Sequence, residues 1–167
     1  MKQKILDFGR IGRFLLPLVA GGCAVAGGAP DAGADEGLKQ AVYEVRPIGV
    51  VRNKKGKPAR LEIFTEYLKG LHRLDNCSHV TVVWWFHKND TPSNRQVLSV
   101  HPRGNKENPL TGVFATHSPV RPNLIAITTC KVLSVKDGVV TIDGIDAFDG
   151  TPILDLKSAG TRTPSLK

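Results

Sequence analysis

Hydrophobic and polar positions alternate most clearly between His79 and His87. The even positions of this run are all apolar, namely Val80, Val82, Trp84 and Phe86. A period of two predicts a β-strand with one face in the core. The odd positions are mixed and end in an imidazole on each side, namely His79, Thr81, Val83, Trp85 and His87. This second face fits either a half-exposed strand surface or a surface that carries function.

Shorter β-rich runs precede and follow this strand. We expect further strands at residues 43–52, 60–64, 96–101, 124–135 and 138–143. Pro47 places the first at a sheet edge, and Lys136-Asp137-Gly138 is a good hairpin turn between the last two. Residues 65–71 predict one or two helical turns capped by Thr65. The prediction is a mainly β fold, a compact antiparallel β-barrel with one or two short helices.

The 167 residues suggest one domain with one core. We expect a leader at residues 1–41, the folded domain at 43–158 and a tail at 159–167. In the leader, basic residues precede a short apolar run, Cys23 and a Gly/Ala/Asp stretch. This order resembles a bacterial lipoprotein signal, with membrane attachment only if Cys23 is lipidated. The alternative is a disordered or mis-started leader on a cytoplasmic protein.

Positive charge is concentrated in the expected domain. The chain carries a formal charge of +8, and residues 41–167 hold eighteen basic and eleven acidic residues, a net charge of +7. Such a field favours a polyanion such as nucleic acid, although a basic surface without such a partner has the same composition. The candidate RNA-binding residues are Lys54, Lys55, Lys57, Arg103, Arg121 and Lys157.

Several familiar sites are missing from the sequence. No GxGxxG follows a strand and no phosphate-binding P-loop occurs, so a Rossmann-type nucleotide site is not expected. The three cysteines form no CxxC pair, which argues against a disulfide framework or structural zinc. His79 and His87 would be roughly 27 Å apart along a strand, too far to share a metal ion. We expect no metal, and Cys130, inside an apolar strand, to be inert.

Two segments combine rigid prolines and permissive glycines with Arg, His, Asn and Asp. They cover residues 101–123 and 146–157. Such loops suit a preorganised polar pocket, in which Asp146 and Asp149 could bind ribose hydroxyls or an amino group. Ordinary turn chemistry is the alternative, because Asp-Gly-Thr-Pro is also a good turn.

These two loops closely resemble the signature of the TrmO/TsaA-like family of S-adenosylmethionine-dependent tRNA methyltransferases. The matching segments are residues 112–126, GVFATHSPVRPNLIA, and residues 146–158, DAFDGTPILDLKS. Shorter matches lie at Ile48–Arg52, Gly70-Leu71, Ser78-His79 and Phe86-His87. The resemblance covers about residues 43–158 in the family's order.

The resemblance implies a β-barrel that binds S-adenosyl-L-methionine without a Rossmann fold, near the interface of a homodimer. It implies N6-methylation of threonylcarbamoyladenosine beside the anticodon of tRNA, and therefore a cytoplasmic protein. The implied cofactor-binding residues are His87, Lys88, His117, Ile127, Asp146, Ala147, Phe148 and Asp149. The alternative is a module that binds the cofactor without catalysis, or that acts on a different substrate. Such a module could be anchored as a lipoprotein through Cys23.

The sequence departs from the family pattern at an important position. The family's Arg in FATR is His117 here, and RPNPIG reads RPNLIA. Arginine stays protonated at working pH, whereas an imidazole titrates near neutrality and can accept a proton. The nitrogen that the resemblance implies is methylated must lose a proton, which a neutral imidazole or a carboxylate could take, so His117 and Asp149 are the candidate catalytic bases. Trp85 and Phe148 are candidates for stacking on a base of the anticodon loop.

Overall fold

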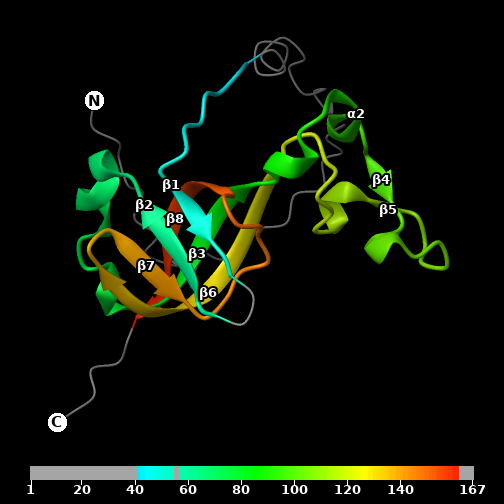
Figure 1. Cartoon of the computed structure of the whole chain (residues 1–167). Coiled ribbons are helices and arrows are strands. Elements are labelled where there is room, and N and C mark those ends of the chain that lie inside the picture. Colours follow the sequence, from blue (N-terminus) through cyan, green and yellow to red (C-terminus); the bar gives the residue numbers. More distant parts are fainter. Residues whose placement is uncertain (1–40, 55–56, 162–167) are drawn as a thin grey trace, which may run out of the picture. The chain divides into compact units, whose positions relative to one another are not determined.

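The computed structural model describes residues 41–54 and 57–161. Within these residues, six strands close into a barrel in the order β1-β2-β7-β6-β3-β8 (Figure 1). Every pair of neighbours is antiparallel. The strands are β1 (Gly49–Arg52), β2 (Ala59–Ile63), β3 (Cys77–Trp85), β6 (Ile125–Lys136), β7 (Val139–Ile142) and β8 (Pro152–Thr161). The predicted antiparallel barrel is confirmed.

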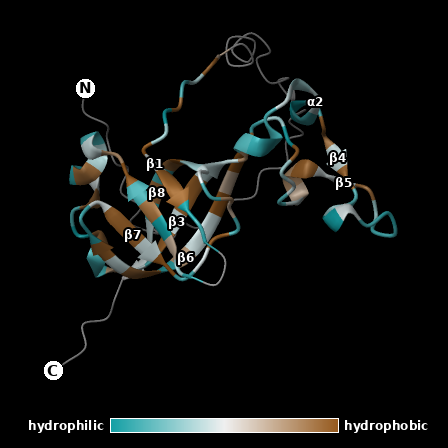
Figure 2. Cartoon of the chain, in the orientation of Figure 1, coloured by the Kyte–Doolittle hydropathy of each residue, from teal (hydrophilic) through white to brown (hydrophobic). Residues whose placement is uncertain are grey.

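The core of the barrel follows the alternation seen in the sequence. On β3, Val80, Val82 and Trp84 are buried, as predicted. Their partners on β6 are Cys130, Thr128 and Ala126. Brown, hydrophobic stretches are interspersed with paler and teal ones along the strands (Figure 2). The strand ends at Trp85, so Phe86 lies just beyond it and His87 begins the 3-10 helix η3 (His87–Asn89) instead of sharing a strand face with His79.

The predicted turn between β6 and β7 is confirmed in its backbone geometry. Asp137 and Gly138 have φ of 49° and 77°. Two consecutive left-handed residues match the right-handed twist of the flanking strands, which is why Asp-Gly is favoured there.

The helical segments are short. They are η1 (Thr65–Leu71), η2 (Leu74–Asn76), η3, α2 (Pro92–Arg95), η4 (Pro102–Gly104) and η5 (Val113–Ala115). The expected cap at Thr65 is wrong, because Thr65 is the first helical residue and Phe64 holds the cap position without a side-chain bond. Thr91 caps α2 instead, its hydroxyl accepting from the Asn94 N–H at 3.2 Å. No helix among the described residues is long and apolar enough to span a membrane.

Three strand predictions need correction. The first strand begins at Gly49 and not at residue 43, because ladder pairing with β2 and β8 starts only there. The run at 96–101 shortens to β4 (Ser99–Val100), which pairs only with β5 (Thr111–Gly112). Residues 152–157, expected in a loop, belong to β8, which pairs with β1 and β3 and continues to Thr161.

The two polar loops meet at one end of the barrel. Residues 86–124 leave β3 and return to β6, and the Phe86 N–H donates to the Leu124 carbonyl at 2.8 Å where the two ends of this segment come together. We call this segment the excursion; it carries α2, β4 and β5 (Figure 1). The connection from β7 to β8 is anchored to β1 by the Gly150 N–H, which donates to the Val51 carbonyl at 2.8 Å.

Candidate functional site

The excursion, the adjoining ends of β3 and β6 and the β7–β8 connection line a pocket of about 1070 Å³. Small-molecule sites typically measure about 300–1,000 Å³, so the pocket has room for a nucleoside-sized ligand and part of a second one. Its lining residues are Trp84, Trp85, Phe86, His87, Lys88, Asn89, Phe114, Ala115, Thr116, His117, Pro119, Arg121, Asn123, Ile125, Ala126, Ile127, Thr128, Asp146, Phe148 and Thr151.

The most buried lining residues form a floor of largely apolar character. Trp84 is 5% exposed, packs edge-to-face on Phe86 with ring centroids 4.7 Å apart, and donates from Nε1 to the Thr128 hydroxyl at 3.1 Å. Thr151 is fully buried, and its hydroxyl has no hydrogen-bond partner among the described residues. A buried hydroxyl left unpaired costs about 1–3 kcal/mol. A ligand group that reaches it would recover that cost.

Lys88 and Phe148 form one wall from two distant parts of the sequence. The Lys88 ammonium lies 4.0 Å from the centroid of the Phe148 ring. A cation over an aromatic face contributes about 0.5–1 kcal/mol at an exposed site. Phe148 remains 60% exposed, so much of its ring is available to another molecule.

A hydrogen-bonded cluster fixes Trp85, which lines the same pocket. Its Nε1 donates to Asp90 Oδ2 at 3.1 Å, and Arg95 binds both oxygens of that carboxylate at 2.8 and 3.0 Å. The Arg95 guanidinium also lies 5.3 Å from the Trp85 ring centroid. The hydrogen bonds from Arg95 and then Trp85 lower the pKa of Asp90, so the carboxylate stays charged at neutral pH. The cluster preorganises the indole before any ligand arrives.

The loop that carries His117 is braced by its own polar groups. Arg121 donates to the Thr116 carbonyl at 3.2 Å, and the Ser118 N–H donates to the Thr116 hydroxyl at 3.3 Å. Hydrogen bonds between side chains and backbone fix the conformation of a loop that lies outside any helix or sheet. His117 is exposed on this loop and lines the pocket.

Asn53 holds the β7–β8 connection in place. Its side-chain amide donates to the carbonyls of Ile145 and Ala147 at 3.0 and 2.7 Å. Its backbone N–H donates to Asp149 Oδ1 at 2.9 Å. These bonds cross more than ninety positions of sequence, and they fix the segment that presents Asp146 and Phe148 to the pocket.

The structure gathers most of the predicted cofactor-binding residues in this pocket. Its lining includes His87, Lys88, His117, Ile127, Asp146 and Phe148. Ala147 and Asp149 do not line it. Ala147 is 8% exposed and belongs to the hydrophobic core, and the Asp149 carboxylate is engaged with Asn53.

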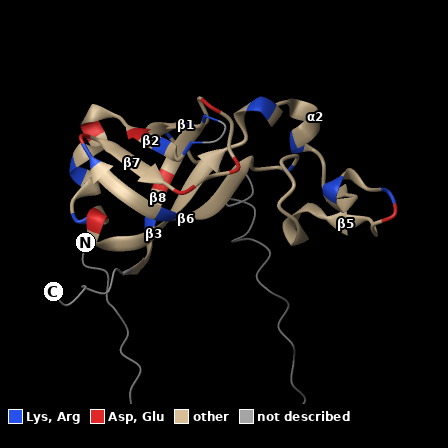
Figure 3. Cartoon of the chain, turned by 60° about the horizontal axis from the view of Figure 1, so that its bottom comes forward, with Lys and Arg blue, Asp and Glu red and all other residues tan. Residues whose placement is uncertain are grey.

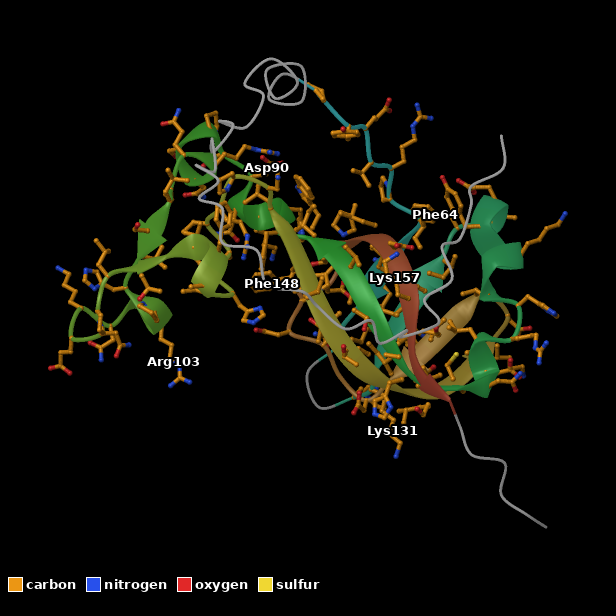
Figure 4. All side chains as sticks on the ribbon, turned by 180° about the vertical axis from the view of Figure 1, so that it is seen from behind. Phe64, Asp90, Arg103, Lys131, Phe148 and Lys157 are labelled. Atoms are coloured by element: carbon orange, nitrogen blue, oxygen red, sulfur yellow. The ribbon has the colours of Figure 1, made fainter. Side chains whose placement is uncertain are left out.

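The predicted RNA-binding residues are spread over several surfaces. Arg121 lines the pocket, and Lys54 and Lys57 line a separate groove. Lys157 is paired with Asp155 at 2.7 Å on β8. Arg103 lies on the excursion, away from Phe148 and Lys157 (Figure 4). Lys55 and Cys23 lie outside the described residues.

The described segments contain no group of side chains arranged to bind a metal, and the Cys130 thiol there is unreactive. No group of three or more His, Cys, Asp or Glu side chains there could hold a metal ion. Burial raises the pKa of the Cys130 thiol to about 11. It stays protonated at neutral pH, which suits a core residue and not a nucleophile.

The pocket combines an aromatic floor with a charged rim. Lys88 and Arg121 supply positive charge, Asp146 supplies negative charge, and His117 supplies a titratable imidazole. This set complements a molecule with a flat ring, a carboxylate and an ammonium group. Sequence reasoning missed Thr151, whose type suggests only a turn residue, and Trp84, which the alternation assigned to the core.

Comparison with known proteins identifies the group of sequences that shares this arrangement. Residues 47–161 match the model of the tRNA-methyltransferase O N-terminal domain. These residues span the whole barrel and the pocket.

Individual relatives support the same match. A "probable S-adenosyl-L-methionine-binding protein" of Methanocaldococcus jannaschii is 46% identical over 116 residues, 70% of this chain and 91% of that protein. A mouse tRNA (adenine(37)-N6)-methyltransferase is 42% identical over 98 residues, 59% of this chain but only 22% of that protein. The crystal structure of TrmO from Pseudomonas aeruginosa matches with a TM-score of 0.55 and 27% identity, over 71% of this chain and 56% of that one.

Proposed function

The chain belongs to the family of tRNA-methyltransferase O N-terminal domains, and on that premise we propose that it is an S-adenosylmethionine-dependent tRNA methyltransferase. The substrate we propose is the adenosine that carries an N6-threonylcarbamoyl group beside the anticodon, with the methyl group added to N6. The name of the mouse relative, an adenine N6-methyltransferase, supports this choice of atom.

The observation that carries the proposal is the pocket that both family loops build together. The residues fit S-adenosyl-L-methionine on two counts. The unpartnered Thr151 hydroxyl on an apolar floor offers a hydrogen bond to a purine ring or ribose. The charged rim has both signs that an amino-acid tail requires, because Asp146 suits its ammonium while Arg121 and Lys88 suit its carboxylate.

When bound, S-adenosyl-L-methionine supplies the electrophilic methyl group. The protein's part is to position the accepting nitrogen and to remove its proton. We assign proton removal to an imidazole nitrogen of His117, because this residue lines the pocket. Asp149, the other candidate, lies outside the lining and anchors the loop through Asn53.

Trp85 and Phe148 are the side chains that we propose stack on the target base. Trp85 is held by Asp90 and Arg95, and the ring of Phe148 is largely exposed beside Lys88. A base taken out of its stack recovers about 1–3 kcal/mol on an aromatic platform. A fixed platform also restricts where the accepting nitrogen can lie.

A second copy of the chain is the partner that we propose for the apolar surface near the pocket. Large apolar side chains exposed there, between 40% and 78%, are Leu98, Leu110, Phe114, Ile125 and Ile127. Exposed apolar residues on neighbouring elements are typical of protein interfaces. A homodimer would also shield the pocket from water. Light scattering on a sizing column should give the mass of a dimer, and a monomer at micromolar concentration would contradict the proposal.

Cofactor binding without methyl transfer is the second candidate function. It is supported by the archaeal relative, whose name claims binding of S-adenosyl-L-methionine and no reaction. Both functions use the same pocket, and they differ in whether the methyl group leaves the cofactor. The methyltransferase proposal places the protein in the cytoplasm, where tRNA is found. Anchoring through Cys23 outside the cytoplasm would favour the binding function.

Calorimetric titration with S-adenosyl-L-methionine and transfer of its labelled methyl group to total tRNA test the two candidates together. We expect saturable binding and labelled tRNA. His117→Ala should keep binding but lose roughly a hundredfold or more in transfer rate. His72→Ala changes an exposed histidine outside the pocket lining and should behave as wild type. Binding without any label on tRNA would sink the methyltransferase proposal and leave the binding module.

A further inference from the structure

A second concavity, of about 320 Å³, lies beside the β1–β2 hairpin and β7. It is lined by Arg52, Lys54, Lys57, Pro58, Arg60 and Thr141. We call it the hairpin groove. Four of its six lining residues are cationic, and none of them lines the larger pocket.

The acidic neighbours of the groove do not neutralise it. Basic and acidic positions lie close together along the β1–β2 hairpin (Figure 3). Glu62 is shared by two guanidinium groups, accepting from Arg52 at 2.8 Å and from Arg60 at 3.2 Å. The hydrogen bond and charge of Glu62, and more weakly the charge of Asp149, raise the pKa of Arg52. Against four cations, these two carboxylates leave an excess of two positive charges. The shared carboxylate of Glu62 fixes both guanidinium groups in place. Each guanidinium still has N–H donors that are not bound to Glu62.

The hairpin groove is tied to the pocket through Asn53. This residue lies between Arg52 and Lys54 of the groove and donates to the carbonyls of Ile145 and Ala147. The segment it grips supplies Asp146 and Phe148 to the pocket. One short, hydrogen-bonded connection therefore separates a cationic groove from the proposed site for a base.

We propose that the hairpin groove binds a backbone phosphate of the RNA strand whose base enters the pocket. This inference rests on the proposed function and names the surface by which the substrate is held. Phosphate contacts from Arg and Lys fix the register of a nucleic acid without reading its sequence. Thr141, whose side chain carries a neutral hydroxyl donor, also lines this groove.

The test compares two double variants that remove the same charge from opposite ends of the barrel. Lys54→Ala/Lys57→Ala alters the hairpin groove. Lys69→Ala/Lys136→Ala alters exposed lysines of η1 and of the last position of β6. Both are next to the opposite end of β2, where the Ile63 N–H donates to the Gly138 carbonyl. The affinity of the full chain for tRNA is measured over a series of salt concentrations. Its affinity for S-adenosyl-L-methionine is measured by calorimetry, and transfer of the labelled methyl group to tRNA is measured in parallel.

We expect the groove variant to bind tRNA at least several-fold more weakly than the control variant. The slope of log affinity against log salt should become shallower by roughly 0.7 for each phosphate that the groove no longer neutralises. Cofactor affinity should be unchanged in both variants. Equal weakening in the two variants, or wild-type tRNA binding by the groove variant, would overturn the inference. Groove-dependent tRNA binding without methyl transfer would instead support the groove and contradict the proposed function.

Discussion

The Lys88 ammonium lies 4.0 Å from the centroid of the Phe148 ring, so the turn after β3 and the connection before β8 are joined at the pocket. Neither segment is near the other in sequence. Their contact brings the charged and aromatic parts of the proposed site together.

Replacing Phe148 with leucine should weaken cofactor binding while leaving the fold intact. Loss of the ring removes the contact that holds the Lys88 ammonium, which we propose binds the cofactor carboxylate. That contact is worth about 0.5–1 kcal/mol, so affinity should fall by at most roughly twofold to fivefold. Phe64→Leu is the matched control, since Phe64 is a partly exposed phenylalanine outside the pocket lining. Titration calorimetry of both variants checks this. Equal affinities for the two would show that Phe148 does not position Lys88 for the cofactor.

Thr151→Val should have opposite effects on stability and binding. Valine has nearly the same shape but lacks the unpartnered hydroxyl, so the melting temperature of the ligand-free protein should be unchanged or higher. Affinity for S-adenosyl-L-methionine should fall by roughly fivefold to a hundredfold, because the missing hydrogen bond is worth about 1–3 kcal/mol.

Thr151→Ser provides the control, because it keeps the hydroxyl. It should retain most of the affinity even if the missing methyl group lowers the melting temperature. A valine variant that binds as tightly as wild type would show that the hydroxyl does not reach the ligand.

Sequence patterns predicted β3, in which inward residues alternate, and missed β8, in which that alternation is interrupted. In β3, an unbroken period of two marks Val80, Val82 and Trp84 as core. In β8, the register with β3 shifts between Val83 and Trp84. Ile153 is buried and Leu156 packs on the core, so the inward residues of β8 are three positions apart and the alternation is interrupted.

The candidate site, like β8, could be predicted only as far as local sequence patterns determine it. Glycine and proline content indicated the two loops, because those residues dictate backbone shape locally. The place of Asp149 depends on Asn53, which is 96 positions away, and no local pattern contains that bond. The Thr151 hydroxyl is buried without a partner among the described residues, and its residue type alone does not indicate this.

His117 should give methyl transfer a pH dependence. A base acts only in its neutral form, so the single-turnover rate should rise with pH while cofactor affinity changes little. His117→Arg places a permanent cation on the same loop and should show a lower, flat profile. If affinity for the cofactor instead falls as pH rises and the rate simply follows it, His117 acts as a cation for the cofactor carboxylate and not as the base.

Cys130 should resist alkylation in the folded protein. Its pKa is raised to about 11, chiefly by burial, so the reactive thiolate is scarce at neutral pH. Because burial makes the folded protein hold this proton more tightly than the unfolded chain does, the folded state loses stability relative to the unfolded chain as the pH rises toward 11. Peptide mapping after iodoacetamide treatment at pH 7 should find Cys77 modified before Cys130. Rapid modification of Cys130 without denaturant would show that the barrel opens.

The most direct test of the proposed function is mass spectrometry of nucleosides from tRNA incubated with the protein and S-adenosyl-L-methionine. Two substrates are compared, tRNA that carries N6-threonylcarbamoyladenosine and the same tRNA from cells that cannot make this modification. We expect a single added methyl group on threonylcarbamoyladenosine in the first tRNA and no methylated adenosine in the second. Equal methylation of both tRNAs, or unmethylated tRNA from a protein that binds the cofactor, would contradict the proposed function.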